Sequence, residues 1–234
     1  MKEDEIMKKN IVIGIEGLVG SGKTSICREM LKKNENAVLL NGGNLYRAIV
    51  YTLMQKEPNI LKLKKITKNV DIKQYMDDLK VEIRIEERES KIYIDGILAD
   101  EEELQSKASS LAVSVIGGIA DNSKLFEFAR NLIDKLREDY DVIVSGRSLM
   151  KIYPNLDYHL FIVASLNERV KRKCIQYNEE KDKKDVKKNI VIRDRLQKIA
   201  GFYKIYPNTI KIDVTDCKSV EESTKKVLKY IKEI

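Results

Sequence analysis

The chain has 234 residues, of which 43% are hydrophobic and 35% charged, and its formal net charge is +7. This length suffices for one sizeable core and a small inserted subdomain. Three widely spaced cysteines without metal-ligand spacing favour free thiols in a reducing, cytoplasmic compartment. No apolar run is long enough to cross a bilayer, so no membrane partner is expected. The basic balance suits phosphate handling, and without a nucleic-acid-binding motif no nucleic-acid partner is expected.

The first predicted strand, residues 11–15, leads into a glycine-rich sequence at residues 17–24 that fits the phosphate-binding pattern G-x-x-x-x-G-K-[ST]. A predicted helix at residues 24–33 follows, and this order of strand, loop and helix N-terminus forms a site for a polyphosphate. Lys23 is expected to reach the outer phosphates and Thr24 to hold Mg²⁺. The candidates for binding a nucleoside triphosphate are Gly17, Gly20, Ser21, Gly22, Lys23, Thr24 and Ser25.

The next predicted elements are a short strand at residues 37–40 and a helix at residues 46–55. Between residues 81 and 94, valines and isoleucines at every second position flank a predicted turn. This alternation is typical of an antiparallel hairpin within an otherwise alternating β/α chain. The hairpin predicts a small insert at residues 62–105. Residues 1–61 and 106–234 then form the core.

The second half of the chain returns to alternating helices and strands. Helices are predicted at residues 102–117, 123–138, 167–178 and 220–234, and strands at residues 141–144, 158–163 and 209–214. Five core strands separated by helices predict an α/β fold with a parallel five-stranded sheet between two helical layers. The charged residues 179–188 are predicted to be a mobile surface segment.

Arginines follow the carboxyl ends of these strands, where ligands of parallel sheets bind. Arg47 follows the second strand, Arg147 the third, and Arg193 lies beyond the charged segment. A planar guanidinium binds phosphate through two hydrogen bonds, so these residues indicate a second phosphate site and phosphoryl transfer. Arg169 and Arg172, on the helix at residues 167–178, could close over the transferring group.

The order and spacing of several short motifs resemble those of the bacterial cytidylate kinases, nucleoside monophosphate kinases with the P-loop fold. The motifs beside the P-loop include Asn41-Gly-Gly-Asn-Leu-Tyr-Arg47-Ala48, Ser145-Gly-Arg147 and Arg193-Asp194. The resemblance implies a three-layer P-loop NTPase fold with a small acceptor-binding insert and a short lid at about residues 174–190. It also implies transfer of the ATP γ-phosphate, with Mg²⁺, to CMP or dCMP.

The same matches imply roles for individual residues. Lys23, Arg147, Arg169 and Arg172 are the expected catalytic residues, the last two as parts of the lid. The acceptor is expected to bind Arg47, Ser114, Ser145, Arg147, Ser148, Arg193 and Gln197. The protein is expected to be a cytoplasmic monomer whose partner is a small nucleotide. His159, the single histidine, is interpreted as a packed residue and not as a catalytic base.

The chain departs from the family pattern where the acceptor would be recognised. Ser145 and Ser148 stand where the family usually has aspartates, while Gln197 and Ala200 replace an aspartate and an arginine. A carboxylate can accept a hydrogen bond from the exocyclic amine of cytosine, so these exchanges bear on acceptor choice. Two alternatives therefore stay open: a P-loop kinase for a different small metabolite, and a weakly catalytic nucleotide-binding protein.

Overall fold

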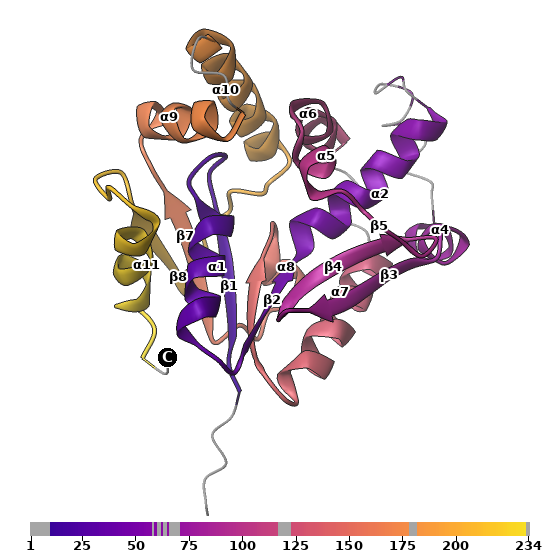
Figure 1. The fold of residues 1–234 in the computed structure, drawn as a ribbon, viewed down its shortest axis with the longest axis horizontal. Helices are drawn as coiled ribbons and strands as arrows, with labels where there is room; N and C mark the ends of the chain where they lie inside the picture. The colour runs from indigo at the N-terminus through magenta and orange to yellow at the C-terminus, as the bar shows by residue number, and fades with distance from the viewer. Residues whose placement is uncertain are drawn as a thin grey trace, which may run out of the picture.

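A twisted sheet runs through the molecule, and helices cover both of its faces (Figure 1). The structure is a computed structural model that describes residues 10–57, 71–116, 123–177 and 182–232, together with Asn59, Lys62 and Lys65. Its five core strands, in spatial order, are β2 (Ala37–Asn41), β6 (Asp141–Ser145), β1 (Val12–Gly17), β7 (Tyr158–Val163) and β8 (Thr209–Asp213). Each pairs in parallel with its neighbours, which confirms the predicted parallel five-stranded sheet.

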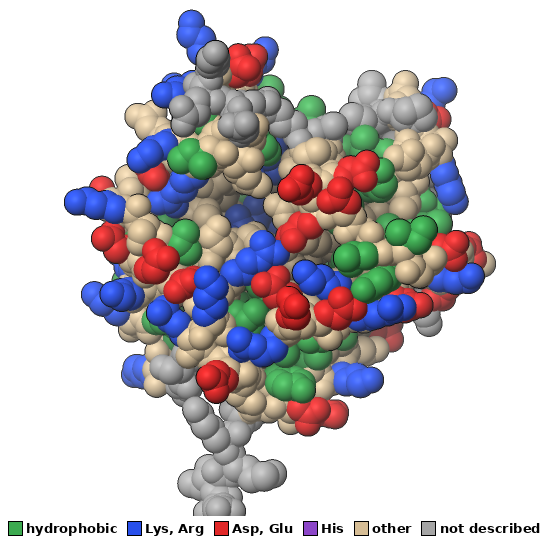
Figure 2. Space-filling model, in the orientation of Figure 1, with side chains coloured by type: hydrophobic (Ala, Val, Ile, Leu, Met, Phe, Trp, Pro, Cys, Tyr) green, Lys and Arg blue, Asp and Glu red, His purple; other side chains and the backbone are tan. Residues whose placement is uncertain are grey.

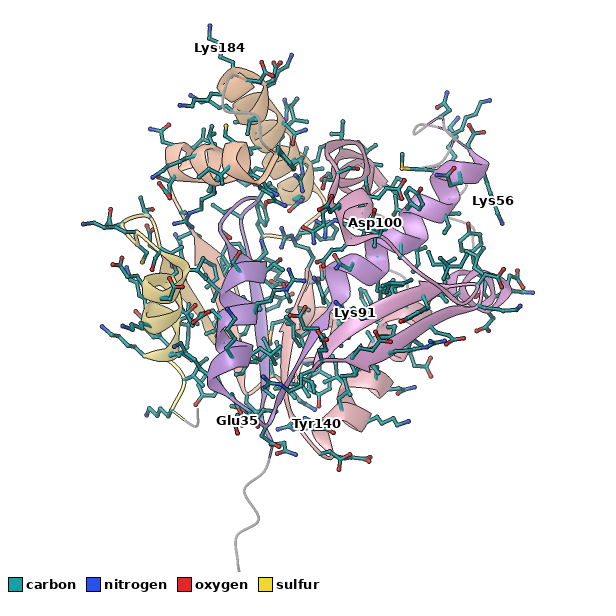
Figure 3. All side chains as sticks on the ribbon, in the orientation of Figure 1. Glu35, Lys56, Lys91, Asp100, Tyr140 and Lys184 are labelled. Carbon is teal, nitrogen blue, oxygen red and sulfur yellow. The ribbon has the colours of Figure 1, made fainter. Side chains whose placement is uncertain are left out.

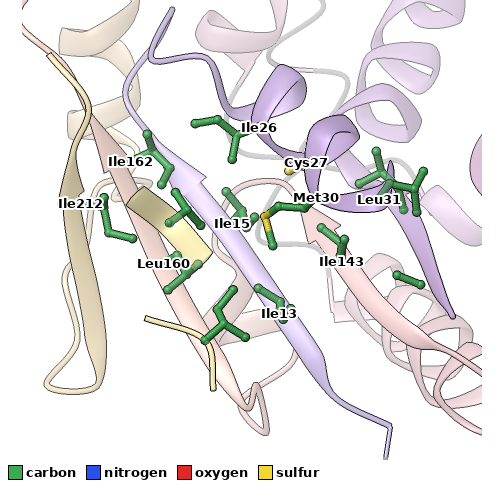
Figure 4. Packing of buried hydrophobic residues seen from close by; sticks show 14 of the residues in the cluster. Ile13, Ile15, Ile26, Cys27, Met30, Leu31, Ile143, Leu160, Ile162 and Ile212 are labelled. Carbon is green, nitrogen blue, oxygen red and sulfur yellow. The ribbon is translucent and has the colours of Figure 1, made fainter. Parts of the chain in front are cut away.

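The two faces of β1 pack into different hydrophobic clusters. Ile13 and Ile15 contact the face covered by α1 (Lys23–Lys33) and α11 (Val220–Leu228), in the cluster of Figure 4. Val12 belongs to a second cluster, beneath α7 (Ser123–Arg137) and α8 (Leu149–Ile152). A parallel sheet covered on both faces needs apolar residues in succession, and this explains the unbroken apolar run at residues 11–15.

The predicted hairpin is present and extends the same sheet. β3 (Val81–Glu86) and β4 (Glu89–Ile94) pair antiparallel, and β4 also pairs with the short β5 (Ile97–Leu98). Only Glu87 and Arg88 form the turn, both with positive φ, as a two-residue hairpin turn requires. Leu39 of β2 pairs in parallel with Glu89 of β4, so the hairpin continues the core sheet at its edge.

The helices on the hairpin side differ in detail from the prediction. They are α2 (Gly42–Lys56), α4 (Ile72–Asp78), α5 (Glu101–Gln105) and α6 (Lys107–Ile116). The single helix predicted at residues 102–117 is broken at Ser106, because the Ser106 N–H bonds to Glu103 O while its hydroxyl accepts from Ser109 N. Ser106 thus ends one helix and caps the next. Residue 117 lies outside the described residues.

Two helices, α9 (Leu166–Tyr177) and α10 (Lys183–Ile199), lie beside each other next to the glycine-rich loop (Figure 1). Val19 of that loop packs with Cys174 of α9 and with Val186 and Ile190 of α10. Residues 183–188, predicted as a mobile segment, therefore belong to a packed helix. Most of the remaining predicted segment, residues 179–181, lies outside the described part of the chain. No helix among the described residues is both long and apolar enough to cross a membrane.

Candidate active site

The glycine-rich loop passes between β7 and α9, and both neighbours exclude larger side chains. A Cβ on Gly17 would lie 2.1 Å from Ile162 O, and one on Gly20 would lie 3.2 Å from Arg169 O. Gly20 and Gly22 also have positive φ, and Gly22 is the N-cap of α1. Glycine is required here by close approach and by backbone conformation together. The loop thus ends at a helix N-terminus, as an anion-binding loop should.

Lys23 lies across its own loop, and its Nζ donates to Gly17 O at 3.1 Å and to Leu18 O at 3.0 Å. Burial, followed by the charges of Arg147, Lys173 and Arg47, holds the pKa of Lys23 well below its ordinary value. The buried hydroxyl of Ser21 has no hydrogen-bond partner among the described residues. Because other cations lie near Lys23, an anion bound at the loop would favour the charged form of this lysine.

Arg169 and Arg172 of α9 bind the glycine-rich loop directly. Arg169 is buried; it donates from Nε to Ala164 O at 3.1 Å and from Nη1 to Val19 O at 3.1 Å, and Nη1 also pairs with Asp194. Arg172 donates from Nη1 to Ser21 O at 2.9 Å. In this structure both predicted lid arginines therefore fix the backbone of the loop.

A second group of cations, Arg47, Arg147, Lys173 and Arg193, lies near Lys23, and buried nitrogens of two of them lack an acceptor in the described part of the chain. Burial, and then the charges of Arg193 and Arg147, lower the pKa of Arg47 to about 10. Burial, Arg193 and Arg47 lower the pKa of Lys173 to about 7. Arg47 Nε and Arg193 Nε and Nη1 are buried and have no hydrogen-bond partner within the described ranges. Arg47, Arg147, Lys173 and Arg193, together with Lys23, are here called the cation cluster. They carry positive charge that a bound phosphate could neutralise.

Three predicted acceptor-binding residues meet at Gln197 of α10. Its Oε1 accepts from Arg147 Nε at 3.0 Å, and its Nε2 donates to Ser114 Oγ at 3.4 Å. Gln197 and Ser114 are buried, and Ser114 of α6 donates to Ser110 O at 2.9 Å. The structure thus brings α6, α10 and the end of β6 together around one amide.

The remaining predicted residues lie at or after the carboxyl end of β6 and in the first turn of α1. Ser145 ends β6 and is buried. Ser148 has φ 54° and precedes α8. Thr24 and Ser25 occupy the first turn of α1, where Ser25 is exposed. The described residues contain no group of three or more His, Cys, Asp or Glu side chains that could hold a metal. A hydroxyl such as that of Thr24 nevertheless suits Mg²⁺ brought by a nucleotide, because that ion keeps water and phosphate oxygens as ligands.

A buried pair behind the site escaped the sequence analysis. Glu16 Oε1 accepts from Leu149 N at 2.7 Å, and its Oε2 lies 3.2 Å from His159 Nε2. His159 Nδ1 lies 2.8 Å from Thr209 Oγ1, and the ring is 1% exposed, which confirms its interpretation as a packed residue. Glu16 therefore anchors the loop that carries Arg147. The signal available in the sequence was an acidic residue between the apolar run at residues 11–15 and Gly17.

The surface is hollowed between the region over α9 and α10 and the region over α5 and α6, and Lys and Arg side chains are visible in the hollow (Figure 2). A glycine-rich loop on β1 and a second cation-rich site beside it, at the carboxyl ends of parallel strands, define a P-loop nucleotide-binding α/β protein.

Comparison with known proteins makes the assignment specific. The chain belongs to the cytidylate kinase family, whose profile matches residues 13–233. It is 31% identical to the cytidylate kinase of Fusobacterium nucleatum over 184 residues, which are 75% of this chain and 72% of that protein. Identity is 27% with the cytidylate kinase of Thermotoga maritima, over 94% and 96% of the two chains. With that of Alkaliphilus oremlandii it is 25%, over 95% and 98%. Membership of this family makes the protein a nucleoside monophosphate kinase.

Proposed function

We propose that the protein transfers the γ-phosphate of ATP to CMP or dCMP. The observation that carries this proposal is the cation cluster, in which buried guanidinium nitrogens of Arg47 and Arg193 have no partner among the described residues. These nitrogens lie beside a loop suited to the phosphates of ATP. Two adjacent anion sites, one formed by a P-loop and one by arginines, are what transfer between two phosphates requires. Membership of the cytidylate kinase family supports the nucleotide acceptor.

The division of roles follows from the contacts of each side chain. The P-loop would hold the ATP phosphates, with Lys23 moving from its own carbonyls to the outer phosphates. Thr24 would hold Mg²⁺, which supplies charge neutralisation at the transferring group. Arg47 and Arg193 would bind the acceptor phosphate. Arg147 would act on both sites, since its charge contributes to the lowered pKa of Lys23 and of Arg47. Catalysis would then rest on positioning and neutralisation.

We further infer that residues 62–105 form the acceptor-binding insert, with residues 174–190 as the lid. Arg28 of α1 ties the core to this insert, since it donates to Glu89 of β4 and to Glu101 of α5 at 2.9–3.2 Å. A cavity of about 370 Å³ lies beside this ion pair. Lys91 and Asp100, labelled in Figure 3, both line it. We also infer that the protein acts as a cytoplasmic monomer.

A second candidate is a kinase for another phosphate-bearing acceptor. It is favoured by neutral side chains at Ser145, Ser148 and Gln197, where a carboxylate would suit the amine of cytosine. The Gln197 amide donates to Ser114 and accepts from Arg147, whereas the aspartate usual in the family could only accept. This candidate shares the cation cluster and differs only in the group attached to the phosphate.

The test is ADP release from Mg·ATP with CMP, dCMP, UMP, AMP or GMP as acceptor. Lys23→Ala serves as the blank, and Lys32→Ala as its matched control on the exposed side of α1. The proposal expects fast turnover with CMP or dCMP, lost in Lys23→Ala and kept in Lys32→Ala. Turnover with a different monophosphate would support the second candidate. ATP binding without turnover of any of these five nucleotides would overturn the transfer to CMP or dCMP and would exclude these nucleotides as acceptors of the second candidate.

A further inference from the structure

Tyr203 lies between residues that bond the P-loop and residues that are predicted to bind the acceptor. It lies in the loop from α10 to β8, and its ring packs edge-on against Phe161 of β7 at 5.9 Å. Its hydroxyl oxygen is 2.7 Å from Asp194 Oδ1 and 2.9 Å from Gln197 Oε1. The sequence analysis did not single out this residue, because a lone tyrosine in a loop carries no motif.

The two acceptors of this hydroxyl bond different parts of the site. Asp194 Oδ1 also accepts from Val19 N of the P-loop at 3.3 Å, and its Oδ2 pairs with Arg169. Gln197 Oε1 also accepts from Nε of Arg147, one of the residues predicted to bind the phosphoryl acceptor. A continuous series of hydrogen bonds therefore runs from the P-loop backbone to Arg147 and passes through a single phenol.

The chemistry of the donors fixes the direction of these bonds. Arg147 can only donate, so the Gln197 amide must present its oxygen to Nε. The same oxygen faces Tyr203, which has one proton to share between Gln197 and the Asp194 carboxylate. Burial is the main cause that raises the pKa of Tyr203 far above its ordinary value, and Asp194 adds to it, so the phenol remains a donor at physiological pH.

Arg147 is therefore held from two directions. Its Nη1 donates to Gly146 O at 3.0 Å, its Nε donates to Gln197, and its guanidinium carbon is 5.9 Å from the centre of the Tyr203 ring. Without the phenol hydroxyl, the Gln197 side chain would keep only its bonds to Arg147 and Ser114, and a buried glutamine held by fewer bonds can take up other rotamers. The direction of the guanidinium would then be less well defined.

We propose that Tyr203 is a positioning residue, whose hydroxyl holds Gln197 against Arg147 and so directs the Arg147 guanidinium toward the acceptor phosphate. This inference rests on the proposed function for the identity of the acceptor. It adds to that function a residue that acts through Arg147. It also links acceptor binding to Asp194, which the P-loop backbone holds in place.

The first test is Tyr203→Phe, which removes the hydroxyl and keeps the ring on Phe161. Tyr206→Phe, in the same loop, is the matched control. The acceptor KM is expected to rise about tenfold in Tyr203→Phe, as the loss of one hydrogen bond to a charged network implies. The KM for ATP and both values in Tyr206→Phe should stay within about twofold of the unmutated protein. An unchanged acceptor KM, or an equal rise in the ATP KM, would overturn the proposal.

A double-mutant cycle with Arg147→Lys tests whether Tyr203 acts through Arg147. If it does, Tyr203→Phe should change the acceptor KM much less in the Arg147→Lys background, because the group it positions is already lost. Fully additive effects of the two substitutions would contradict the role. Melting temperatures of all variants identify any that simply unfold.

A binding measurement separates this inference from the proposed function. The dissociation constant of inorganic phosphate is measured by calorimetry with the P-loop saturated by a non-hydrolysable ATP analogue. Tyr203→Phe should weaken phosphate about tenfold whichever acceptor is the natural one. If no nucleotide supports turnover yet phosphate binding shows this loss, the proposed function fails and the role of Tyr203 stands. If phosphate binds equally to both proteins, the role of Tyr203 is excluded.

Discussion

Two pairs of arginines at the same site have opposite surroundings. Arg169 and Arg172 donate to backbone carbonyls of the P-loop, and each also pairs with a carboxylate. Arg47 and Arg193 have buried nitrogens with no partner in the described part of the chain, and burial together with neighbouring cations lowers the pKa of both. The first pair builds the phosphate loop, and the second keeps positive charge available for a ligand.

The difference lies in what offsets the cost of burying a charge. Carbonyl and carboxylate oxygens offset it for Arg169, so removal of that arginine leaves several buried acceptors unmet. For Arg193 the cost is offset less, because two of its buried nitrogens lack an acceptor in the described part of the chain, so the free protein is less stable than its packing would allow. A functional site is thus marked by unmet charge, while the structural arginines beside it donate to carbonyl and carboxylate oxygens.

The largest expected effect is a loss of stability on replacing Arg169, which belongs to the pair that bonds the P-loop. Arg169→Met should lower the free energy of unfolding by about 3–5 kcal/mol, because Asp194 and the carbonyls of Ala164 and Val19 lose their donor. Urea unfolding followed by circular dichroism measures this change. Arg84→Met, on the exposed face of β3, is the control and should change stability by less than about 0.5 kcal/mol. Equal effects of the two substitutions would contradict the structural role of Arg169.

For the second pair, Arg47 and Arg193, a change in the free energy of unfolding of opposite sign is expected. Arg193→Met should raise the free energy of unfolding by about 1 kcal/mol or more, because it removes a buried charge that has unbonded nitrogens. It should also weaken acceptor binding by about 10- to 150-fold, the loss of one charged hydrogen-bonding group. Unfolding and calorimetric titration are measured on the same preparation. A less stable variant with unchanged binding would show that Arg193 is structural.

Proton uptake on ligand binding would sharpen the comparison. The pKa of Lys173 is lowered to about 7 in the free protein, and a bound anion favours its charged form. Phosphate affinity should therefore fall as pH rises above about 7, by at most about tenfold per pH unit for one proton. Titrations between pH 7.5 and 9 measure this slope, with Lys173→Arg as the matched variant that stays charged and should show a flatter profile. Identical profiles would exclude Lys173 as the titrating group.

The same shift has a stability consequence with a definite sign. Because the folded-state pKa of Lys173 lies below the ordinary 10.5, the unfolded chain binds this proton more tightly. The contribution of Lys173 to stability therefore rises with pH between about 7 and 10.5. The melting temperature of the unmutated protein, compared with that of Lys173→Arg over this range, measures the effect. A difference that shrinks or stays constant with pH would contradict it.

The smallest expected effect comes from giving the cation cluster a fixed counter-charge. Gln197→Glu places a carboxylate against Arg147 Nε, much as Asp194 faces Arg169. The melting temperature should rise by about 2–4 °C if the new ion pair contributes about 1 kcal/mol. Phosphate binding should weaken severalfold because the cluster is partly neutralised. Gln74→Glu, at an exposed position of α4 away from the cluster, is the control. Tighter phosphate binding in Gln197→Glu would refute the electrostatic argument.

Much of the fold follows from local sequence patterns. Apolar runs predicted the five parallel strands, and period-two alternation predicted the hairpin β3–β4, because both patterns report burial of the strand itself. Helix α10 was missed over residues 183–188, where Val186 and Ile190 give one buried apolar residue per turn among many lysines. That spacing is helical, but among so many charged residues it is a weak signal. The packing of these two residues against Val19 appears only in the folded structure.

The sequence by itself determined the P-loop, the parallel sheet and which arginines stand at the ends of its strands. These features depend on residue type and spacing within one segment, so no distant contact is needed to recognise them. Only the tertiary structure decided which arginines are bonded and which keep unmet charge, and that Tyr203 connects Asp194 to Gln197. Those properties depend on which acceptors the fold brings within 3 Å of a side chain from elements distant in sequence, and no local pattern records that distance.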